Sequence, residues 1–221
     1  MTDDGFWIEQ NVLTPSECDS LVEVLVDRAN VRGRAGARNL MTPPPIVALA
    51  NDPRLLRIAG HAFGKAMIPY RATFFDKSIG ANWLVAWHQD TVLPIAARFR
   101  SPDWGPWSQK AGVLFARAPA WALSRVLALR IHLDSSTSEN GPLRIIPGSH
   151  HFGVLSGDEV HTVARRSNSI ECLAGRGGVI AMSPLVIHCS SRIRVNSPRR
   201  VIHIEYADSL RLGESVQLVT A

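Results

Sequence analysis

Apolar positions follow a helical spacing in the first part of the 221-residue chain. Thr14-Pro15-Ser16-Glu17 has the form of a capping box with proline at the first helical position, and an apolar stripe follows at 21–25. This pattern predicts a helix that continues to about Asn30. A basic, glycine-containing loop at 33–38 is predicted next, followed by a second helix at 51–64.

From residue 70 onwards the apolar residues form short runs, separated by clusters of Gly, Pro, Asn and Ser. The candidate strands are 70–76, 82–88, 126–134, 143–146, 178–182, 185–190 and 201–206. Many short strands joined by turns predict an antiparallel sandwich or barrel, mainly β with flanking helices. No repeat and no linker divides the chain, so residues 1–221 are predicted to form a single domain.

The stretch 91–125 interrupts this strand pattern and carries Trp104, Trp107 and Trp121 among several prolines. Insertions of this length within a domain usually serve a function, such as a lid or a binding loop. The tryptophans are therefore expected either to cover a substrate or to form a small core within the insertion itself.

Composition excludes several classes of protein. The chain is 46% hydrophobic and 19% charged, as is ordinary for a folded, soluble protein, and its net charge of +5 suits an anionic small molecule. Lys and Arg are spread out, so no nucleic-acid partner is predicted. The acidic N-terminus and the lack of a long apolar run predict neither a signal peptide nor a membrane span, which makes the cytoplasm the expected location. The three cysteines form no CxxC pair and indicate no disulfide framework or zinc site.

Histidine and carboxylate pairs suggest a metal centre. Two His and one carboxylate bind iron in a facial triad, and His-x-Asp on a strand turns two of these ligands to one face. The chain has two His-x-Asp pairs, His88-Gln89-Asp90 and His132-Leu133-Asp134, and the comparable pair His203-Ile204-Glu205. The motif alone therefore does not identify the ligands.

A third ligand and a fixed cation narrow the choice. His188 lies in an apolar segment, where a lone polar ring is otherwise unfavourable, and Arg199 follows eleven positions later. Strand parity places Arg199 on the mixed face of His203 and Glu205, whereas Arg200 shares the apolar face. Arg199 is therefore the better clamp for a carboxylate.

Two of the three pairs can use His188 as the third ligand. His203-x-Glu205 is excluded because no histidine follows it, although it can still line the pocket. The pair His132-x-Asp134 remains a rival to His88-x-Asp90. Asp134 stands at the start of the turn 135–141, where aspartate commonly caps the chain.

Further residues carry a family resemblance. They are Trp87-His88-Gln89-Asp90, Asn-Gly-Pro-Leu-Arg-Ile-Ile-Pro-Gly-Ser-His at 140–150, and His188 with Arg199 eleven positions on. With the segments 5–18 and 74–78, these elements resemble the phytanoyl-CoA dioxygenase family of 2-oxoglutarate oxygenases over nearly the whole chain.

The resemblance implies a double-stranded β-helix core, a jelly roll of the cupin type, with N-terminal helices along one side. Residues 1–68 are expected to give helical support and 69–208 the core, with 91–125 as a lid-like insertion. The resemblance implies His88, Asp90 and His188 as iron ligands and Arg199 as the partner of the distal 2-oxoglutarate carboxylate. It places Asp134 outside the ligand positions.

Further candidates surround the centre. Those assigned to 2-oxoglutarate besides Arg199 are Lys77, Thr91, Arg130 and Ser190, and those assigned to the substrate pocket are Asn82, His132, His203 and Trp107. Arg130 stands where some family members have an aromatic residue, so it is expected to bind either 2-oxoglutarate or an anionic substrate. Two roles are considered for Lys77, a cation in the pocket and a solvated charge at the end of a strand.

The resemblance further implies Fe(II), 2-oxoglutarate and O2 as cofactors, with ascorbate helpful in vitro. The expected reaction hydroxylates a small-molecule metabolite and releases succinate and CO2. Asp90 favours hydroxylation, because related halogenases lack this carboxylate. The alternative from another class is a non-catalytic, cupin-like protein that binds a metal or a small molecule. The sequence predicts neither the substrate nor the oligomeric state.

Overall fold

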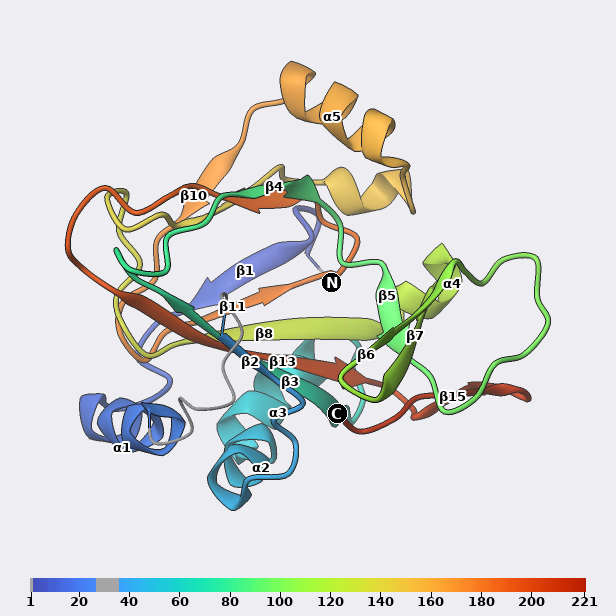
Figure 1. Ribbon diagram of the computed structural model, residues 1–221, viewed down its shortest axis with the longest axis horizontal. Helices are drawn as coiled ribbons and strands as arrows, with labels where there is room; N and C mark the ends of the chain where they lie inside the picture. Colours follow the sequence, from blue (N-terminus) through green and yellow to red (C-terminus); the bar gives the residue numbers. More distant parts are fainter. Residues whose placement is uncertain (1, 27–35) are drawn as a thin grey trace.

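A computed structural model of the chain describes residues 2–26 and 36–221. Two antiparallel sheets face each other, and helices lie on their outer faces (Figure 1). The helices are α1 (Pro15–Val26), α2 (Pro44–Ala50), α3 (Pro53–His61), α4 (Ala120–Leu123), the 3-10 helix η2 (Ser149–Phe152) and α5 (Gly157–Arg166). The strands are β1 (Phe6–Glu9), β2 (Gly36–Arg38), β3 (Ile68–Lys77), β4 (Val85–His88), β5 (Val92–Pro94), β6 (Trp107–Lys110), β7 (Val113–Arg117), β8 (Val126–His132), β9 (Leu143–Ile145), β10 (Ile170–Cys172), β11 (Val179–Met182), β12 (His188–Ser190), β13 (Arg199–Ala207), β14 (Arg211–Gly213) and β15 (Val216–Gln217).

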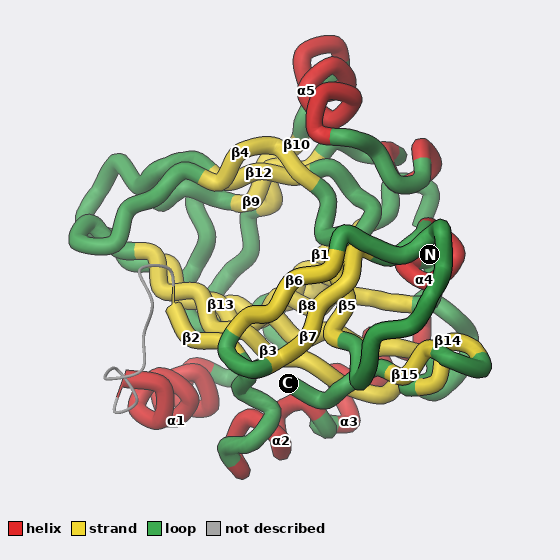
Figure 2. Tube along the Cα trace, turned by 45° about the vertical axis from the view of Figure 1, so that its right-hand side comes forward, coloured by secondary structure: helices red, strands yellow, loops and turns green. Residues whose placement is uncertain are grey.

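The larger sheet has the order β1-β11-β8-β13-β3-β2, and the smaller sheet has the order β10-β9-β12-β4. Strands that are distant in sequence are neighbours in both sheets, as Figure 2 shows from a second side. The jelly-roll core implied by the family resemblance is confirmed.

Side-chain alternation divides the larger sheet into two different faces. Its outer face presents residues such as Phe74, Ile131 and Ile202, which pack with α1, α2 and α3 in the main hydrophobic core. The face turned towards the smaller sheet is apolar near β11, where Ile180 and Met182 meet β9. On β3, β8 and β13 the same face is polar instead. This polar part of the inner face is where the candidate site lies.

The N-terminal helices are held by predicted caps and by one shared arginine. Thr14 and Glu17 form the capping box of α1, with the Thr14 amide donating to Glu17 Oε2 at 2.7 Å. Arg54 of α3 pairs with Glu17 at 2.6 Å and with Asp52 at 2.7 Å, which joins α3 to α1. The predicted end of the first helix near Asn30 lies outside the described residues.

Several predicted boundaries are wrong. Residues 36–38, expected to be loop, form β2 at the edge of the larger sheet, and β1 pairs with β11, so the first 68 residues supply strands as well as helices. Helices α2 and α5 were not predicted. The strand expected at 185–190 begins only at His188, because the amide of Val186 closes a turn onto the Ser183 carbonyl at 3.1 Å.

The insertion 91–125 has secondary structure of its own. Strands β5, β7 and β6 form a three-stranded sheet, and α4 follows it. Phe99 stands edge-on to Trp104 and Trp107, with ring centroids 5.4 and 5.3 Å apart, and Trp104 contacts Trp121. Trp104 and Trp107 therefore pack in a hydrophobic cluster that joins the insertion to residues outside it, such as Leu212 and Leu218. A cover over the substrate stays a prediction.

Two negative expectations concern the whole described chain. No helix within residues 2–26 and 36–221 is both long and apolar enough to cross a membrane. Cys18, Cys172 and Cys189 are buried free thiols.

The contact between helices and sheet predicts a large effect of one core substitution. Phe74 is completely buried on the outer face of β3. Phe74→Ala should lower the free energy of unfolding by about 3–5 kcal/mol, because it removes the ring and leaves a cavity. Phe152→Ala is the matched control, since its ring is 58% exposed, and it should change stability by less than about 0.5 kcal/mol. Urea unfolding of both variants measures the difference, and similar losses would contradict this view of the core.

Candidate metal centre

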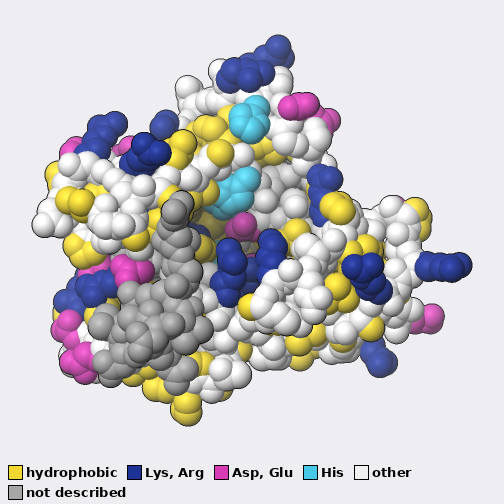
Figure 3. Space-filling view, viewed as in Figure 1, with side chains coloured by type: hydrophobic (Ala, Val, Ile, Leu, Met, Phe, Trp, Pro, Cys, Tyr) yellow, Lys and Arg dark blue, Asp and Glu magenta, His cyan; other side chains and the backbone are white. Residues whose placement is uncertain are grey.

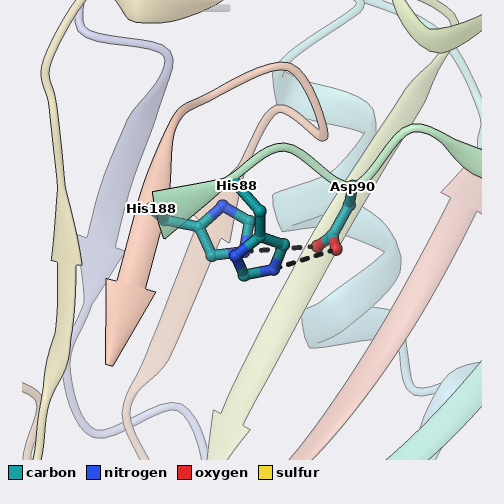
Figure 4. Close-up of side chains that lie close together, drawn as sticks. All are labelled: His88, Asp90 and His188. Atoms are coloured by element: carbon teal, nitrogen blue, oxygen red, sulfur yellow. Dashed lines mark ion pairs between the residues drawn. The ribbon is translucent and has the colours of Figure 1, made fainter. Parts of the chain in front are cut away.

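His88, Asp90 and His188 meet at one point of the smaller sheet. His88 ends β4, Asp90 follows two residues later, and His188 begins β12 directly opposite His88 in the antiparallel register. One ligand atom from each lies within 4.8 Å of the other two. Figure 4 shows both rings turned towards the Asp90 carboxylate, which lies 3.6 Å from His88 Nε2 and 3.5 Å from His188 Nε2.

Backbone contacts orient both imidazole rings in the same way. His88 Nδ1 lies 2.8 Å from the Ala86 carbonyl, and His188 Nδ1 lies 2.9 Å from the Val186 carbonyl. A carbonyl oxygen accepts a hydrogen bond, so each Nδ1 carries the proton and each Nε2 keeps its lone pair. Two imidazole nitrogens and one carboxylate oxygen converge, which is the donor set of a non-haem Fe(II) facial triad.

Burial and charge prepare these side chains for a cation. Burial, together with the neighbouring His88, lowers the pKa of the His188 imidazole to about 3, so its ring is neutral. Burial alone would raise the pKa of the Asp90 carboxyl, but the two histidines outweigh it and hold that pKa well below its usual range. A neutral His188 and an ionised Asp90 are the forms that a metal requires.

Gln89, between the two ligands of the His-x-Asp pair, points to the opposite side. Its amide nitrogen donates to the carbonyls of Gly153 and Leu185, both at 2.7 Å, and its amide oxygen accepts from the Leu155 amide at 2.9 Å. It thereby ties the chain before α5 to the segment that leads into β12. Sequence reasoning did not single out Gln89, although strand alternation places it away from the ligands.

The triad opens into a cavity of about 400 Å³ between the two sheets. In Figure 3 a histidine and an acidic side chain are visible in a hollow, with Lys or Arg side chains beside it. The lining is formed by the triad and by Arg38, Arg71, Thr73, Phe75, Lys77, Trp83, Val85, Val92, Lys110, Arg130, Leu143, Cys189, Ser190, Arg199, His203 and Glu205.

Three cations are buried in the wall of this cavity. Lys77 donates to Ser190 Oγ at 2.7 Å and to the Ser191 carbonyl at 2.6 Å, and Arg199 donates to the same hydroxyl at 2.9 Å. Arg130 Nη1 donates to His203 Nδ1 at 3.2 Å. Within the described residues none of the three cations forms an ion pair with a carboxylate, and Nε and Nη1 of Arg199 have no hydrogen-bond partner. A bound anion would compensate these buried charges.

The same crowding shifts the ionisation of the cations. Burial, followed by repulsion from Arg199 and Arg130, lowers the pKa of the Lys77 ammonium to about 7. Burial, with Arg130 nearby, lowers the pKa of Arg199 to about 9. The protein therefore maintains three like charges at a free-energy cost, which a dianionic ligand would relieve.

The rival pair does not assemble a centre. Asp134 forms a bidentate ion pair with Arg200, with both nitrogen–oxygen distances at 2.7 Å, and also accepts from the Arg200 amide. The expected cap at 135–141 comes instead from Asn140, whose side chain binds the Thr137 amide and the Ser135 carbonyl. Among the described residues, one group of three His, Cys, Asp or Glu side chains could hold a metal ion, and it consists of His88, Asp90 and His188.

Comparisons with known proteins now identify the family. The phytanoyl-CoA dioxygenase family model matches residues 27–201, most of the chain. The chain belongs to the phytanoyl-CoA dioxygenase family.

The chain also resembles a hydroxylase at low sequence identity. An L-proline trans-4-hydroxylase of Streptomyces griseoviridis is 28% identical over 186 residues, which cover 72% of this chain and 61% of that protein. The chain thus spans less than two thirds of the length of this relative.

Solved structures share the fold of this dioxygenase-family chain. AviO1 from Streptomyces viridochromogenes Tue57 has a TM-score of 0.67 and 23% identity, with 93% of this chain and 90% of that chain covered. The epimerase SnoN from nogalamycin biosynthesis, solved with Fe3+, alpha ketoglutarate and nogalamycin RO, has a TM-score of 0.72 and 15% identity, with 94% and 80% covered. EctD from S. alaskensis with bound Fe has a TM-score of 0.65 and 19% identity, with 93% and 73% covered.

Four of the residues predicted to surround the metal centre do not line the cavity. Thr91 lies on the opposite side of the ligand strand, beside Arg117 and Leu155. Asn82 binds both the amide and the carbonyl of Ile193 and so holds a loop in place. Trp107 belongs to the same hydrophobic cluster as Trp104.

His132 is the fourth of these residues. It shares the inward parity of Arg130, as expected, but its ring is completely buried and does not line the cavity. Neither ring nitrogen has a hydrogen-bond partner in the part of the chain that the structure describes, and burial holds the pKa of this imidazole well below its usual range. Lys77, Arg130, Ser190, Arg199 and His203 do line the cavity, and their roles stay predictions.

The lowered pKa of Lys77 predicts a change in the pH dependence of stability. The unfolded chain holds this proton up to a pH near 10.5, whereas the folded protein releases it near 7, so the penalty is complete below pH 7 and disappears as the pH rises to about 10.5. Lys77→Met should therefore remove a rise in unfolding free energy of a few kcal/mol (on the order of 1.4 per pKa unit) between these pH values.

Denaturant unfolding of wild type and Lys77→Met, without 2-oxoglutarate, measures the effect at several pH values. Lys65→Met is the control, because the side chain of Lys65 is about half exposed and its ammonium pairs with Asp208. Parallel stability curves for wild type and Lys77→Met would contradict a charged, buried Lys77.

Proposed function

We propose that the chain is an Fe(II)- and 2-oxoglutarate-dependent dioxygenase that hydroxylates a small-molecule metabolite and releases succinate and CO2. One observation carries the proposal. A two-His, one-carboxylate triad faces a cavity of about 400 Å³ together with three buried cations that pair with no carboxylate among the described residues. The triad suits iron, and the cations suit the distal carboxylate of the cosubstrate.

Each residue has a distinct part in this proposal. His88, Asp90 and His188 would hold the iron through Nε2, a carboxylate oxygen and Nε2. When bound, iron and 2-oxoglutarate supply the oxygen activation, in which decarboxylation of the cosubstrate is coupled to oxidation of the substrate.

Arg199 is the residue proposed to bind the distal carboxylate of 2-oxoglutarate. Its free Nε and Nη1 are available for two hydrogen bonds, while Ser190 holds Nη2 at 2.9 Å. Lys77, which binds the same Ser190 hydroxyl, adds a second charge to this site. Residues of both sheets exclude bulk water around it, which strengthens these charge contacts.

The relatives support the reaction class. Hydroxylation of a small molecule is the activity named for the Streptomyces griseoviridis relative, and SnoN was solved with Fe3+ and alpha ketoglutarate. We further propose that residues 1–221 act as one oxygenase domain, in which 69–208 form the core and 91–125 border the cavity. The cytoplasmic location stays a prediction.

The first prediction from this proposal concerns turnover. With Fe(II), ascorbate and 2-oxoglutarate, the purified protein should produce succinate, and His88→Ala should abolish production because the iron loses a ligand. His161→Ala is the control, since this histidine lies on the exposed α5 and its ring contacts the Gly157 carbonyl of its own helix. Succinate is measured by chromatography, and bound iron by metal analysis.

Two negative results have different meanings. A wild type that binds Fe(II) and 2-oxoglutarate but never decarboxylates it, even with candidate substrates, would favour the non-catalytic, cupin-like alternative. A wild type that binds neither would contradict both the enzyme and the proposed metal centre.

The second prediction separates two adjacent arginines. Arg199→Ala should raise the 2-oxoglutarate concentration needed for half-maximal activity on the order of 100-fold, because a buried charge partner of the carboxylate is lost. Arg200→Ala should leave this concentration nearly unchanged, since Arg200 pairs with Asp134 outside the cavity. Steady-state kinetics measures both variants. Equal effects would contradict the assignment of the clamp by strand parity.

A further inference from the structure

A second group of cations lies in the same cavity, apart from Lys77, Arg130 and Arg199. Arg71 of β3 and Lys110 of β6 both line the cavity. Arg71 Cζ lies 5.0 Å from the ring centroid of Phe115, and Lys110 Nζ lies 5.8 Å from the same centroid. Two cations from distant parts of the sequence therefore converge on one ring, although like charges repel each other.

Among the described residues that line the cavity, cations outnumber carboxylates. The described lining residues include six cations, namely Arg38, Arg71, Lys77, Lys110, Arg130 and Arg199, against two carboxylates, those of Asp90 and Glu205. Fe(II) and the 2-oxoglutarate dianion would cancel each other. Four positive charges would then remain, and a substrate anion would reduce this excess.

Glu205 holds Arg71 but leaves part of its guanidinium available. Both Glu205 oxygens contact the same Nη1 of Arg71, at 3.3 and 3.4 Å, and Glu205 also lies 3.6 Å from His203. These are long contacts for a buried ion pair. In the described part of the chain, the recorded hydrogen bonds of the Arg71 side chain all involve Nη1, so Nε and Nη2 can still bind a carboxylate.

We propose that Arg71 and Lys110 form a substrate subsite that binds a carboxylate, so that the substrate is a small carboxylic acid. This inference rests on the proposed function, since the subsite shares its cavity with the triad. Glu205 is a positioning residue that orients the Arg71 guanidinium. The insertion 91–125 takes part in recognition because its β6–β7 hairpin supplies both Lys110 and the Phe115 ring.

Matched probes of equal shape and different charge test the subsite. The complete chain is loaded with Zn(II), which allows no turnover, and with saturating 2-oxoglutarate, which occupies the Arg199 site. Dissociation constants for benzoate and neutral benzamide are then measured by ligand-observed NMR. Wild type should bind benzoate at least roughly tenfold more tightly than benzamide.

Three variants assign the preference to the subsite. Lys110→Gln and Arg71→Gln should each weaken benzoate binding by roughly tenfold while leaving benzamide binding unchanged. Arg57→Gln, an exposed arginine on α3 outside this cavity, should bind benzoate as wild type does. Lys110→Gln is the deciding variant, because Lys110 is exposed, whereas Arg71→Gln leaves Glu205 buried with less compensation and can destabilise the fold.

The outcomes separate this subsite from the oxygenase proposal. Equal dissociation constants for the two probes, absence of binding by either, or unchanged benzoate binding in Lys110→Gln would each overturn the subsite. Zn(II) and 2-oxoglutarate binding are measured by calorimetry on the same samples. Failure of both to bind, with benzoate binding that still depends on Lys110, would contradict the oxygenase and retain the subsite.

Discussion

One antiparallel register between two short strands determines the arrangement of the candidate centre. β4 and β12 pair so that His88 and His188 are directly opposite each other, and their ring centroids lie 4.2 Å apart. Asp90 stands beyond the end of β4, where its amide donates to the Pro184 carbonyl at 2.9 Å. A shift of one residue in this register would turn one imidazole to the outer face of the sheet and would separate the ligands. The ring orientations are set locally instead, since each Nδ1 contacts the carbonyl two residues earlier in its own segment, that of Ala86 or Val186.

The larger sheet supplies the opposite wall of the cavity, and its two faces have contrasting energetics. Its outer face buries aliphatic and aromatic side chains against α1–α3, which stabilises the fold. On its inner face, Lys77, Arg130 and Arg199 are buried as cations, which destabilises the empty protein. The apolar outer layer and the apolar β9–β11 region offset this cost. An anion bound beside these three cations would relieve their repulsion, and its binding would therefore stabilise the folded protein.

Strand parity explains which parts of the site the sequence predicts. Side chains alternate between the two faces of a strand, which places His88 and Asp90 on one face and puts Arg199 and Arg200 on opposite faces. The observed contacts agree with both inferences. Parity predicts the face of the sheet to which a side chain points, but not whether that side chain reaches the cavity. His132 points inward as expected, yet it is completely buried and does not line the cavity. Thr91 and Asn82 were chosen for their closeness to the ligands in sequence, and the chain leaves the sheet on both sides of β4.

Contacts between distant segments account for the remaining differences. The edge strands β1 and β2 have three or four residues each and are defined by the partner strands β11 and β3 rather than by their own pattern. α5 was not predicted, although Ser156 and Glu159 form a capping box that is visible in the sequence. Lys110 gave no signal at all, because its place in the cavity depends on how the insertion folds.

The separation between the triad and the insertion has a consequence for the evolution of specificity. The ligands lie on or directly beside paired strands of the smaller sheet. Gln89 ties them through two hydrogen bonds to the chain before α5 and through one to Leu185, which leads into β12. Lys110 and Phe115 lie instead on a hairpin whose Trp107 packs in the cluster with Phe99 and Trp104. The hairpin belongs to a sheet separate from the one that carries the histidines, so we expect substitutions on it to alter what the cavity accepts without moving the histidines. Loops carried by a rigid scaffold commonly diversify binding in this way, and here the hairpin carries Lys110, one of the two cations of the proposed subsite.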